Sequence, residues 1–394
     1  MKAICEKTYC FGCTACENIC PKEAIIMKED KRGFKYPVIN EDKCINCGLC
    51  KKVCPYYEVK EIKNNKTTAI AVKNKDENIR IQSTSGGIFT EIARYIIENN
   101  GIVYAATYDD ELQVVHKELK NIEDIPKFRG SKYVQSNMEG IIKKIEENNE
   151  KSKKSVFIGT PCQVAGIKKY LKAKGNLDGV ILIDLICHGV PSPKIWKEHI
   201  KILNKKGRLE NFRFRTKIKG WHRNVQEIEY EQGRKDYKSP LSQSYNELYF
   251  TENISRKSCY NCPFTDINRV SDITIGDFWG VEKRYPEFDD NKGISLVLIN
   301  TEKGERLFSN IGNKLVTKIV KVEEILQPQL KYPVKEPVNN KTFWEEYEKY
   351  GYEYILKKYT NMNIKRRIKS KVKELVMRIT PKRIKDSIKS RLSR

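Results

Sequence analysis

The chain has 394 residues, of which 39% are hydrophobic, and its 75 Lys and Arg against 51 Asp and Glu give a formal net charge of +24. Its most apolar run, residues 180–186, is interrupted by Asp184, and no stretch approaches the ~18 apolar residues that a membrane span needs. Residues 1–10 lack the apolar core of a signal peptide. We therefore expect a cytoplasmic protein of two or three domains.

Residues 1–57 hold two copies of one cysteine pattern, C-x2-C-x2-C-x3-C-P, with short strands predicted at 24–27 and 34–39. This spacing is typical of two-cluster bacterial ferredoxins, in which the fourth cysteine of each run ligates the cluster of the other run. Zinc sites use pairs of cysteines rather than runs of four, so a zinc ribbon fits less well. We expect one [4Fe-4S] cluster on Cys10, Cys13, Cys16 and Cys54, and a second on Cys20, Cys44, Cys47 and Cys50.

The rest of the chain alternates between predicted strands and helices, which indicates an α/β or α+β body. Ile88, Ile92 and Ile96 recur at helical spacing and predict an amphipathic helix. The other predicted helices lie at 163–172, 193–204 and 345–359, and the strands at 68–72, 101–106, 155–159, 179–186, 212–215, 225–230, 273–275 and 295–299. We divide the chain into a ferredoxin domain (1–57), a linker (58–68), two parts of the body (69–150 and 151–337) and a helical basic tail (338–394).

Four further cysteines form a third candidate set. Cys162 and Cys187 each follow a predicted strand directly, and Cys259 and Cys262 form a C-x2-C pair. Ligands of open sheets bind outside the carboxyl ends of the strands, so parallel strands would bring Cys162 and Cys187 to one edge. The set suits a third [4Fe-4S] cluster, while a zinc ion or four buried cysteines without a common site remain alternatives.

Two short segments could bind the phosphates or the ring of a cofactor. The first opens a predicted helix with a hydroxyl and two glycines, which present free N–H groups to a phosphate, although such residues are also ordinary helix caps. The second places two cations and Tyr133 around a tight turn, which suits a dinucleotide but also a solvated turn. The candidate cofactor-binding residues are Ser85, Gly86, Gly87, Arg129, Ser131 and Lys132.

The basic tail has an amphipathic pattern. Residues 363–394 hold thirteen Lys and Arg against Glu374 and Asp386, and Ile364, Ile368 and Val372 recur among them at helical spacing. We expect either contact with a membrane surface at its inner face or with an acidic partner, or a merely solvated helix. The other lysines are dispersed and no nucleic-acid module is recognised, so we expect no specific nucleic-acid partner.

Six segments, taken together and in this order, resemble the coenzyme F420 hydrogenase/dehydrogenase beta-subunit family. They cover about residues 70–300, and the tail after about Pro337 lies outside the resemblance. The segments are STSGG (83–87), RGSKYVQS (129–136), GTPCQ (159–163), CHGVPSP (187–193), CYNCPF (259–264) and DITIGDFWG (272–280).

The resemblance implies an FAD in the body near an iron–sulfur cluster. Members pass a hydride between a deazaflavin coenzyme and the flavin, which releases single electrons to the clusters, so a redox protein or a small redox coenzyme is the expected partner. Members with an N-terminal ferredoxin and a basic tail resemble those encoded among surface-polysaccharide genes. A ferredoxin-linked reductase of polysaccharide biosynthesis without a deazaflavin is thus one alternative, and a basic binding protein with structural clusters is another. Nothing in these residues identifies the hydride donor or the terminal acceptor.

Overall fold

The computed structural model describes residues 3–57, 67–151, 154–368 and 372. Its N-terminal unit is an antiparallel hairpin of β1 (Ile25–Glu29) and β2 (Lys35–Ile39), with the short helices α1 (Ala15–Asn18) and α2 (Leu49–Lys52) formed inside the two cysteine runs. Asp30 closes the hairpin because its Oδ1 accepts hydrogen bonds from the backbone N–H groups of Arg32 and Phe34, both at 3.0 Å. The predicted ferredoxin-like unit is thereby confirmed.

An eight-stranded mixed sheet forms the centre of the body. The strand order is β13 (Leu315–Val320), β3 (Thr68–Asn74), β12 (Ser295–Ile299), β11 (Ile273–Asp277), β7 (Val180–Leu185), β6 (Ser155–Gly159), β4 (Ile102–Tyr108) and β5 (Val114–Leu119). The four strands from β11 to β4 run parallel, and antiparallel strands flank them on both sides. Strand β3 pairs with β12 and β13, so the parts before and after residue 150 share one sheet.

Helices cover both faces of this sheet, as the predicted α/β class requires. Helices α4 (Ile88–Glu98) and α11 (Glu302–Ile311) pack on the face that carries Val103, whereas α6 (Ile141–Glu150) and α7 (Pro161–Lys174) pack on the face that carries Ile102. Neighbouring residues of β4 therefore enter different cores, because side chains alternate along a strand. Burying one such Ile side chain contributes about 1.5–3 kcal/mol to stability.

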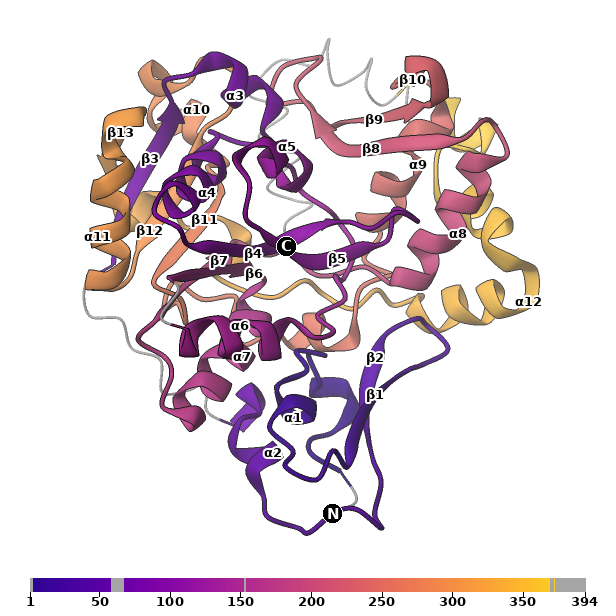
Figure 1. Ribbon diagram of the computed structural model, residues 1–394. Helices are drawn as coiled ribbons and strands as arrows, with labels where there is room; N and C mark the ends of the chain where they lie inside the picture. The colour runs from indigo at the N-terminus through magenta and orange to yellow at the C-terminus, as the bar shows by residue number, and fades with distance from the viewer. Residues whose placement is uncertain (1–2, 58–66, 152–153, 369–371, 373–394) are drawn as a thin grey trace.

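A second layer lies beside the sheet (Figure 1). It contains the antiparallel strands β8 (Leu209–Thr216), β9 (Val225–Tyr230) and β10 (Lys235–Asp236) and the helices α8 (Pro193–Asn204), α9 (Pro240–Tyr249) and α12 (Asn340–Tyr359). Its core is aromatic: the Trp196 ring lies 4.9 Å from that of Phe212 and 5.0 Å from that of Tyr245. The remaining helices are α3 (Glu77–Gln82), α5 (Ile125–Phe128) and α10 (Val281–Arg284).

The ferredoxin unit packs against the body below α6 and α7 (Figure 1). Phe11, Ala15 and Val53 of the unit belong to the same buried cluster as residues of α6 and α7. The Phe11 ring meets the edge of the Phe264 ring at 5.3 Å, just after the third cysteine set. This shared core fixes the cysteine runs relative to the sheet.

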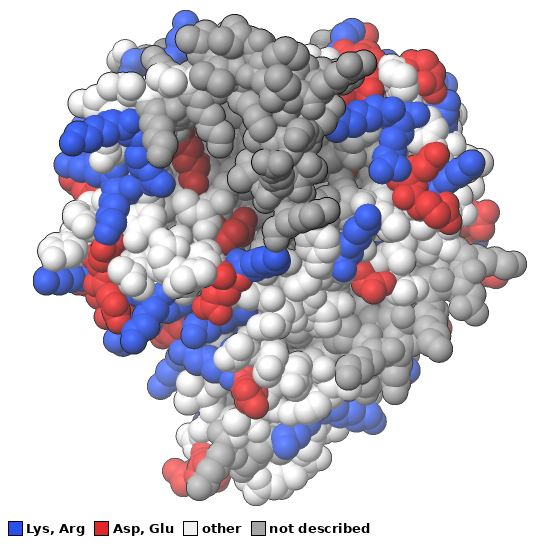
Figure 2. Space-filling view, turned by 180° about the vertical axis from the view of Figure 1, so that it is seen from behind, with Lys and Arg blue, Asp and Glu red and all other residues white. Residues whose placement is uncertain are grey.

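Of the predicted basic tail, residues 369–371 and 373–394 lie outside the described residues. In the part of the chain that is described, no helix is long and apolar enough to cross a membrane. Figure 2 shows one face of the molecule, on which the Lys and Arg side chains are interspersed with Asp and Glu rather than gathered in one field.

Candidate redox site

The first cysteine set lines one cavity in the ferredoxin unit. Cys10, Cys13 and Cys16 of the first run meet Cys54 of the second run there, so the crossed arrangement that the spacing predicts brings these four thiols together. Burial raises the pKa of Cys13 and Cys16, because an isolated thiolate is poorly solvated there. Such thiols need a metal centre to hold them as thiolates, and a four-thiol cage fits a [4Fe-4S] cluster.

Cys5 also lines this cavity, a position that the sequence did not single out. Its thiol is hydrogen-bonded to the sulfurs of Cys10 and Cys54, and this contact raises the pKa of Cys5. The same hydrogen bond lowers the pKa of Cys10, and the charge of Arg256 acts in the same direction. A short spacing to Cys10 is the only sequence signal for this contact.

The second cysteine set lines a separate cavity at the far end of the hairpin. Cys20 of the first run meets Cys44, Cys47 and Cys50 of the second run. Cys47 is exposed, whereas Cys10, Cys13 and Cys54 of the first set are buried. The second cage therefore lies nearer to solvent than the first.

The third set gathers at the carboxyl edge of the parallel strands. Cys162 lies in the first turn of α7, where Thr160 caps the helix and its N–H donates to Gln163 Oε1 at 2.9 Å. Cys187 follows β7, which runs parallel to β6. Val190, three residues after Cys187, donates its N–H to Cys259 Sγ at 3.4 Å, and Cys162 and Cys262 pack against the same buried cluster. Burial, and then the nearby Cys259, Cys162 and Cys262, raise the pKa of Cys187.

The spacing of these thiols bears on what they can hold. Sulfurs that bind one zinc ion lie about 2.3 Å from it. In the described ranges, no group of three His, Cys, Asp or Glu side chains is arranged to hold a single metal ion. A cage around a multi-atom cluster is wider than one around a single ion.

A basic cavity of about 590 Å³ lies between the Arg129–Lys132 turn and β8. Arg129, Ser131 and Lys132, three of the residues predicted to bind a cofactor, line it. Arg213 and Arg215 of β8 line the opposite side, and the sequence had not indicated them. Its size lies within the range of small-molecule sites, about 300–1,000 Å³, and its charge suits a pyrophosphate.

The cations of this cavity are held in place by polar contacts. Arg215 Nη1 lies 2.5 Å from Asp277 Oδ2, and Arg129 Nε donates to Thr90 Oγ1 at 2.9 Å. The Lys132 ammonium donates to the carbonyls of Phe128 and Arg129 at 3.1 and 3.0 Å. Burial lowers the pKa of Lys132 to about 7.

The predicted Ser85–Gly87 segment packs against the sheet and does not line this cavity. Ser85 Oγ donates to Ile294 O at 2.7 Å, and Gly86 N donates to Ser295 Oγ at 2.9 Å. A Cβ atom on Gly86 would lie 2.2 Å from Val72 O, so only glycine fits there. Thr84, the residue before this segment, contacts the cavity turn: its Oγ1 accepts a hydrogen bond from Ser131 N at 2.9 Å.

A row of rings joins the basic cavity to the third cysteine set. Tyr133 follows the cavity turn and stacks on Tyr249 with ring centroids 4.8 Å apart. The edge of His188 meets Tyr249 at 5.3 Å, and His188 is the residue after Cys187. Glu252 Oε1 lies 2.6 Å from His188 Nε2 and fixes the orientation of that ring.

Family models match most of the chain. The N-terminal and C-terminal models of the beta subunit of coenzyme F420 hydrogenase/dehydrogenase match residues 69–143 and 152–325. Two models of 4Fe-4S dicluster domains match residues 9–57 and 36–84. These matches cover both the body and the ferredoxin unit.

Two individual proteins are also similar. The coenzyme F420-dependent sulfite reductase of Methanocaldococcus jannaschii is 25% identical over 262 residues, which are 65% of this chain and 39% of that protein. This chain thus spans about two fifths of the length of that curated relative. A chain from the xenon-derivatised F420-reducing [NiFe] hydrogenase complex of Methanosarcina barkeri aligns with a TM-score of 0.46 and 20% identity, over 71% of this chain and 92% of that chain. On the family models, this chain belongs to the iron–sulfur oxidoreductase family of coenzyme F420 hydrogenase/dehydrogenase beta subunits.

Proposed function

We propose that this chain is a flavin- and iron–sulfur-dependent oxidoreductase that passes electrons between a hydride-carrying coenzyme, FAD and [4Fe-4S] clusters. The coenzyme would be an F420-like deazaflavin or an equivalent hydride carrier. The observation that carries the proposal is the contact row Tyr133–Tyr249–His188, which connects the basic cavity to Cys187. A bound FAD would supply the exchange between a two-electron hydride and single electrons.

The cavity residues would bind and orient the FAD. Arg129, Lys132 and Arg213 offer cations from two sides of the cavity, which suits the two charges of a pyrophosphate. Asp277 holds Arg215 at 2.5 Å and prevents it from turning away. Phe214 lines the cavity and packs against the Tyr133 ring at 5.4 Å, which connects the cavity to the row of rings.

The cysteine sets would hold three clusters along one path: the third set next to the cavity, then the first set, and then the second set. The row of rings connects the set of Cys162, Cys187, Cys259 and Cys262 to the cavity, and Gly166 of α7, the helix that carries Cys162, lies against Cys13 of the first set. Cys47 of the second set is exposed and is the natural exit towards a redox partner. Metal binding would displace the protons that these buried thiols otherwise keep.

Two other functions compete with this proposal. The same cofactors would serve a ferredoxin-linked reductase of surface polysaccharide biosynthesis that uses no deazaflavin. A basic binding protein with structural clusters would need a continuous positive surface, and the face in Figure 2 shows Lys and Arg interspersed with Asp and Glu.

Reduction of the anaerobically purified protein separates the three. Reduced deazaflavin, NADH, NADPH and reduced ferredoxin are added in separate experiments while the flavin and cluster absorbances are followed. We expect a hydride donor to bleach the flavin first and the clusters afterwards. Reduction by ferredoxin alone would favour the polysaccharide reductase, and a protein that no donor reduces would contradict both enzymatic functions.

A further inference from the structure

Arg256 lies fully inside the contact between the ferredoxin unit and the body, with 1% of its surface exposed. Its Nε donates to Cys10 O at 2.7 Å, and its Nη2 donates to Lys35 O at 2.9 Å. Its Nη1 donates to Gln135 Oε1 at 2.9 Å, while the amide of Gln135 donates to Phe11 O at 2.9 Å. One guanidinium thus fastens the first cysteine run to the body.

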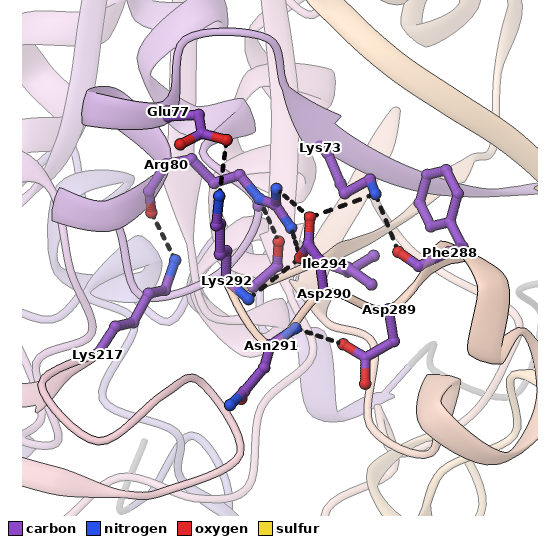
Figure 3. A network of polar contacts seen from close by, with 12 residues as sticks. Lys73, Glu77, Arg80, Lys217, Phe288, Asp289, Asp290, Asn291, Lys292 and Ile294 are labelled. Atoms are coloured by element: carbon purple, nitrogen blue, oxygen red, sulfur yellow. Dashed lines mark hydrogen bonds and ion pairs between the residues drawn. The ribbon is translucent and has the colours of Figure 1, made fainter.

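The charge of Arg256 has no carboxylate partner among the residues that the structure describes. Arg80 shows the usual arrangement: it is also buried, 4% exposed, but its Nη1 donates to Asp290 Oδ2 at 2.7 Å (Figure 3). Removing one partner of a buried pair leaves an uncompensated charge, which is strongly unfavourable. An anion beside Arg256 would therefore lower the cost of burying its charge.

A sulfur of the first cysteine set lies beside the Arg256 guanidinium. Arg256 Nη2 lies 3.7 Å from Cys10 Sγ, and its Nη1 lies 2.9 Å from where the Cβ of a side chain on Gly12 would begin. The face of the guanidinium is covered by Tyr36, 4.3 Å from its ring centre. The positive charge is thus enclosed by apolar and backbone groups on one side and by the Cys10–Cys13 loop on the other.

We propose that Arg256 is a positioning residue of the electron path, which places a fixed positive charge beside the centre held by Cys10, Cys13, Cys16 and Cys54. This rests on the proposed function in that it requires a cluster on this set. One-electron reduction adds one negative charge to such a centre, and a nearby cation stabilises the reduced form more than the oxidised form. Arg256 thereby raises the reduction potential of the first centre.

The position of Arg256 in the chain, between the first and third cysteine sets, bears on the direction of electron transfer between them. Cys259 of the third set lies three residues later, and its N–H donates to Arg256 O at 2.9 Å. The same residue is therefore tied to the first set by its side chain and to the third set by its backbone. A raised potential at the first centre favours electron flow from the third set into the ferredoxin unit.

Potentiometric titration of the full chain, followed by electron paramagnetic resonance, tests this role with Arg256→Gln and Arg256→Lys. Gln removes the charge, and we expect the reduction equilibrium of one centre to become about tenfold less favourable, which corresponds to about 59 mV for one electron. Lys keeps the charge and should restore at least half of that change. Arg80→Gln is the matched control, because it removes a buried arginine whose side chain bonds Asp290 and Gly293 and should leave the cluster potentials unchanged.

Each outcome of this titration supports the role or overturns it. An iron-replete Arg256→Gln protein with the potentials of the wild type would overturn it, and so would equal shifts in the Gln and Lys variants, which would indicate a steric effect. If the Gln variant loses iron, the Lys variant decides: retained iron with a near-normal potential supports the role, and iron loss in both overturns it. Wild-type protein without iron on this set would instead contradict the proposed function itself.

Discussion

Cys13 of the ferredoxin unit lies directly against Gly166 of α7: a Cβ atom on Gly166 would be 2.6 Å from Cys13 Sγ. Gly166 lies one helical turn after Cys162, so both residues are on the same side of α7. No side chain therefore separates the first cysteine set from the helix that carries the third. Under the proposed function, this contact would make the first set the recipient of electrons from the body.

Gly166→Ala should disturb the first cluster. The added methyl group needs the space that Cys13 occupies, so we expect the iron content to fall by about four atoms, the content of one cluster. Gly312→Ala is the control, since nothing lies within 4 Å of a Cβ at that position. Iron analysis of both variants checks the prediction, and a full iron content in Gly166→Ala would contradict it.

Cys162→Ser should remove the third cluster alone. A serine oxygen is a poor substitute for a thiolate, so we expect a loss of about four irons while the ferredoxin clusters remain. Cys5→Ser is a matched control, because Cys5 lines the first cavity but belongs to none of the three proposed ligand sets. Equal iron contents in Cys162→Ser and the wild type would show that no cluster depends on Cys162.

Arg213→Gln should weaken FAD binding at least tenfold, because a charge-assisted hydrogen bond contributes about 1.5–3 kcal/mol. The control is Lys235→Gln. Arg213 and Lys235 lie 3.5 and 3.6 Å from the same oxygen, Glu227 Oε1, but only Arg213 lines the cavity. Fluorescence titration of the flavin-free protein measures the dissociation constants, and equal losses in both variants would locate the effect in Glu227 instead.

FAD binding should depend on pH through Lys132. Burial lowers the pKa of Lys132 to about 7, so its ammonium is charged below that pH and loses its proton above it. Because the charged form attracts a pyrophosphate, the FAD affinity should fall as the pH rises from 6 to 8.5, by up to roughly tenfold.

Lys132→Met removes the titrating group and should give the weaker affinity over this whole range. The readout is the FAD dissociation constant of both proteins at several pH values. If the variant and the wild type lose affinity with the same slope, another group causes the pH dependence.

Local sequence signals predicted several elements with their bounds. Strand β12 is a run of buried apolar residues, and α8 begins at Ser192 and Pro193, so each is specified by its own residues. The edge strands β5 and β13 were not predicted. Ile319 of β13 is 76% exposed, and this strand gains its pairing only from β3, which lies about 240 residues earlier.

The candidate site was predictable where chemistry depends on spacing. The pattern of the first eight cysteines already specifies how Cys54 joins the first set. The cavity was harder, since Arg213 and Arg215 lie on a strand that is far in sequence from Arg129. Their alternate positions place both on one face of β8, which was the available signal. Ser85 and Gly86 show that residue type alone does not place a side chain in the cavity. A hydroxyl and a glycine suit a phosphate site, but they also suit close packing against β3 and β12.

The most direct test of the central claim is the quantitation of iron, sulfide and released flavin in protein purified without oxygen. The account predicts about twelve irons, an equal amount of sulfide and one FAD per chain, from three [4Fe-4S] clusters and one flavin. About eight irons without flavin would contradict it and would leave a ferredoxin fused to a binding domain. Zinc as the bound metal would contradict the iron–sulfur chemistry altogether.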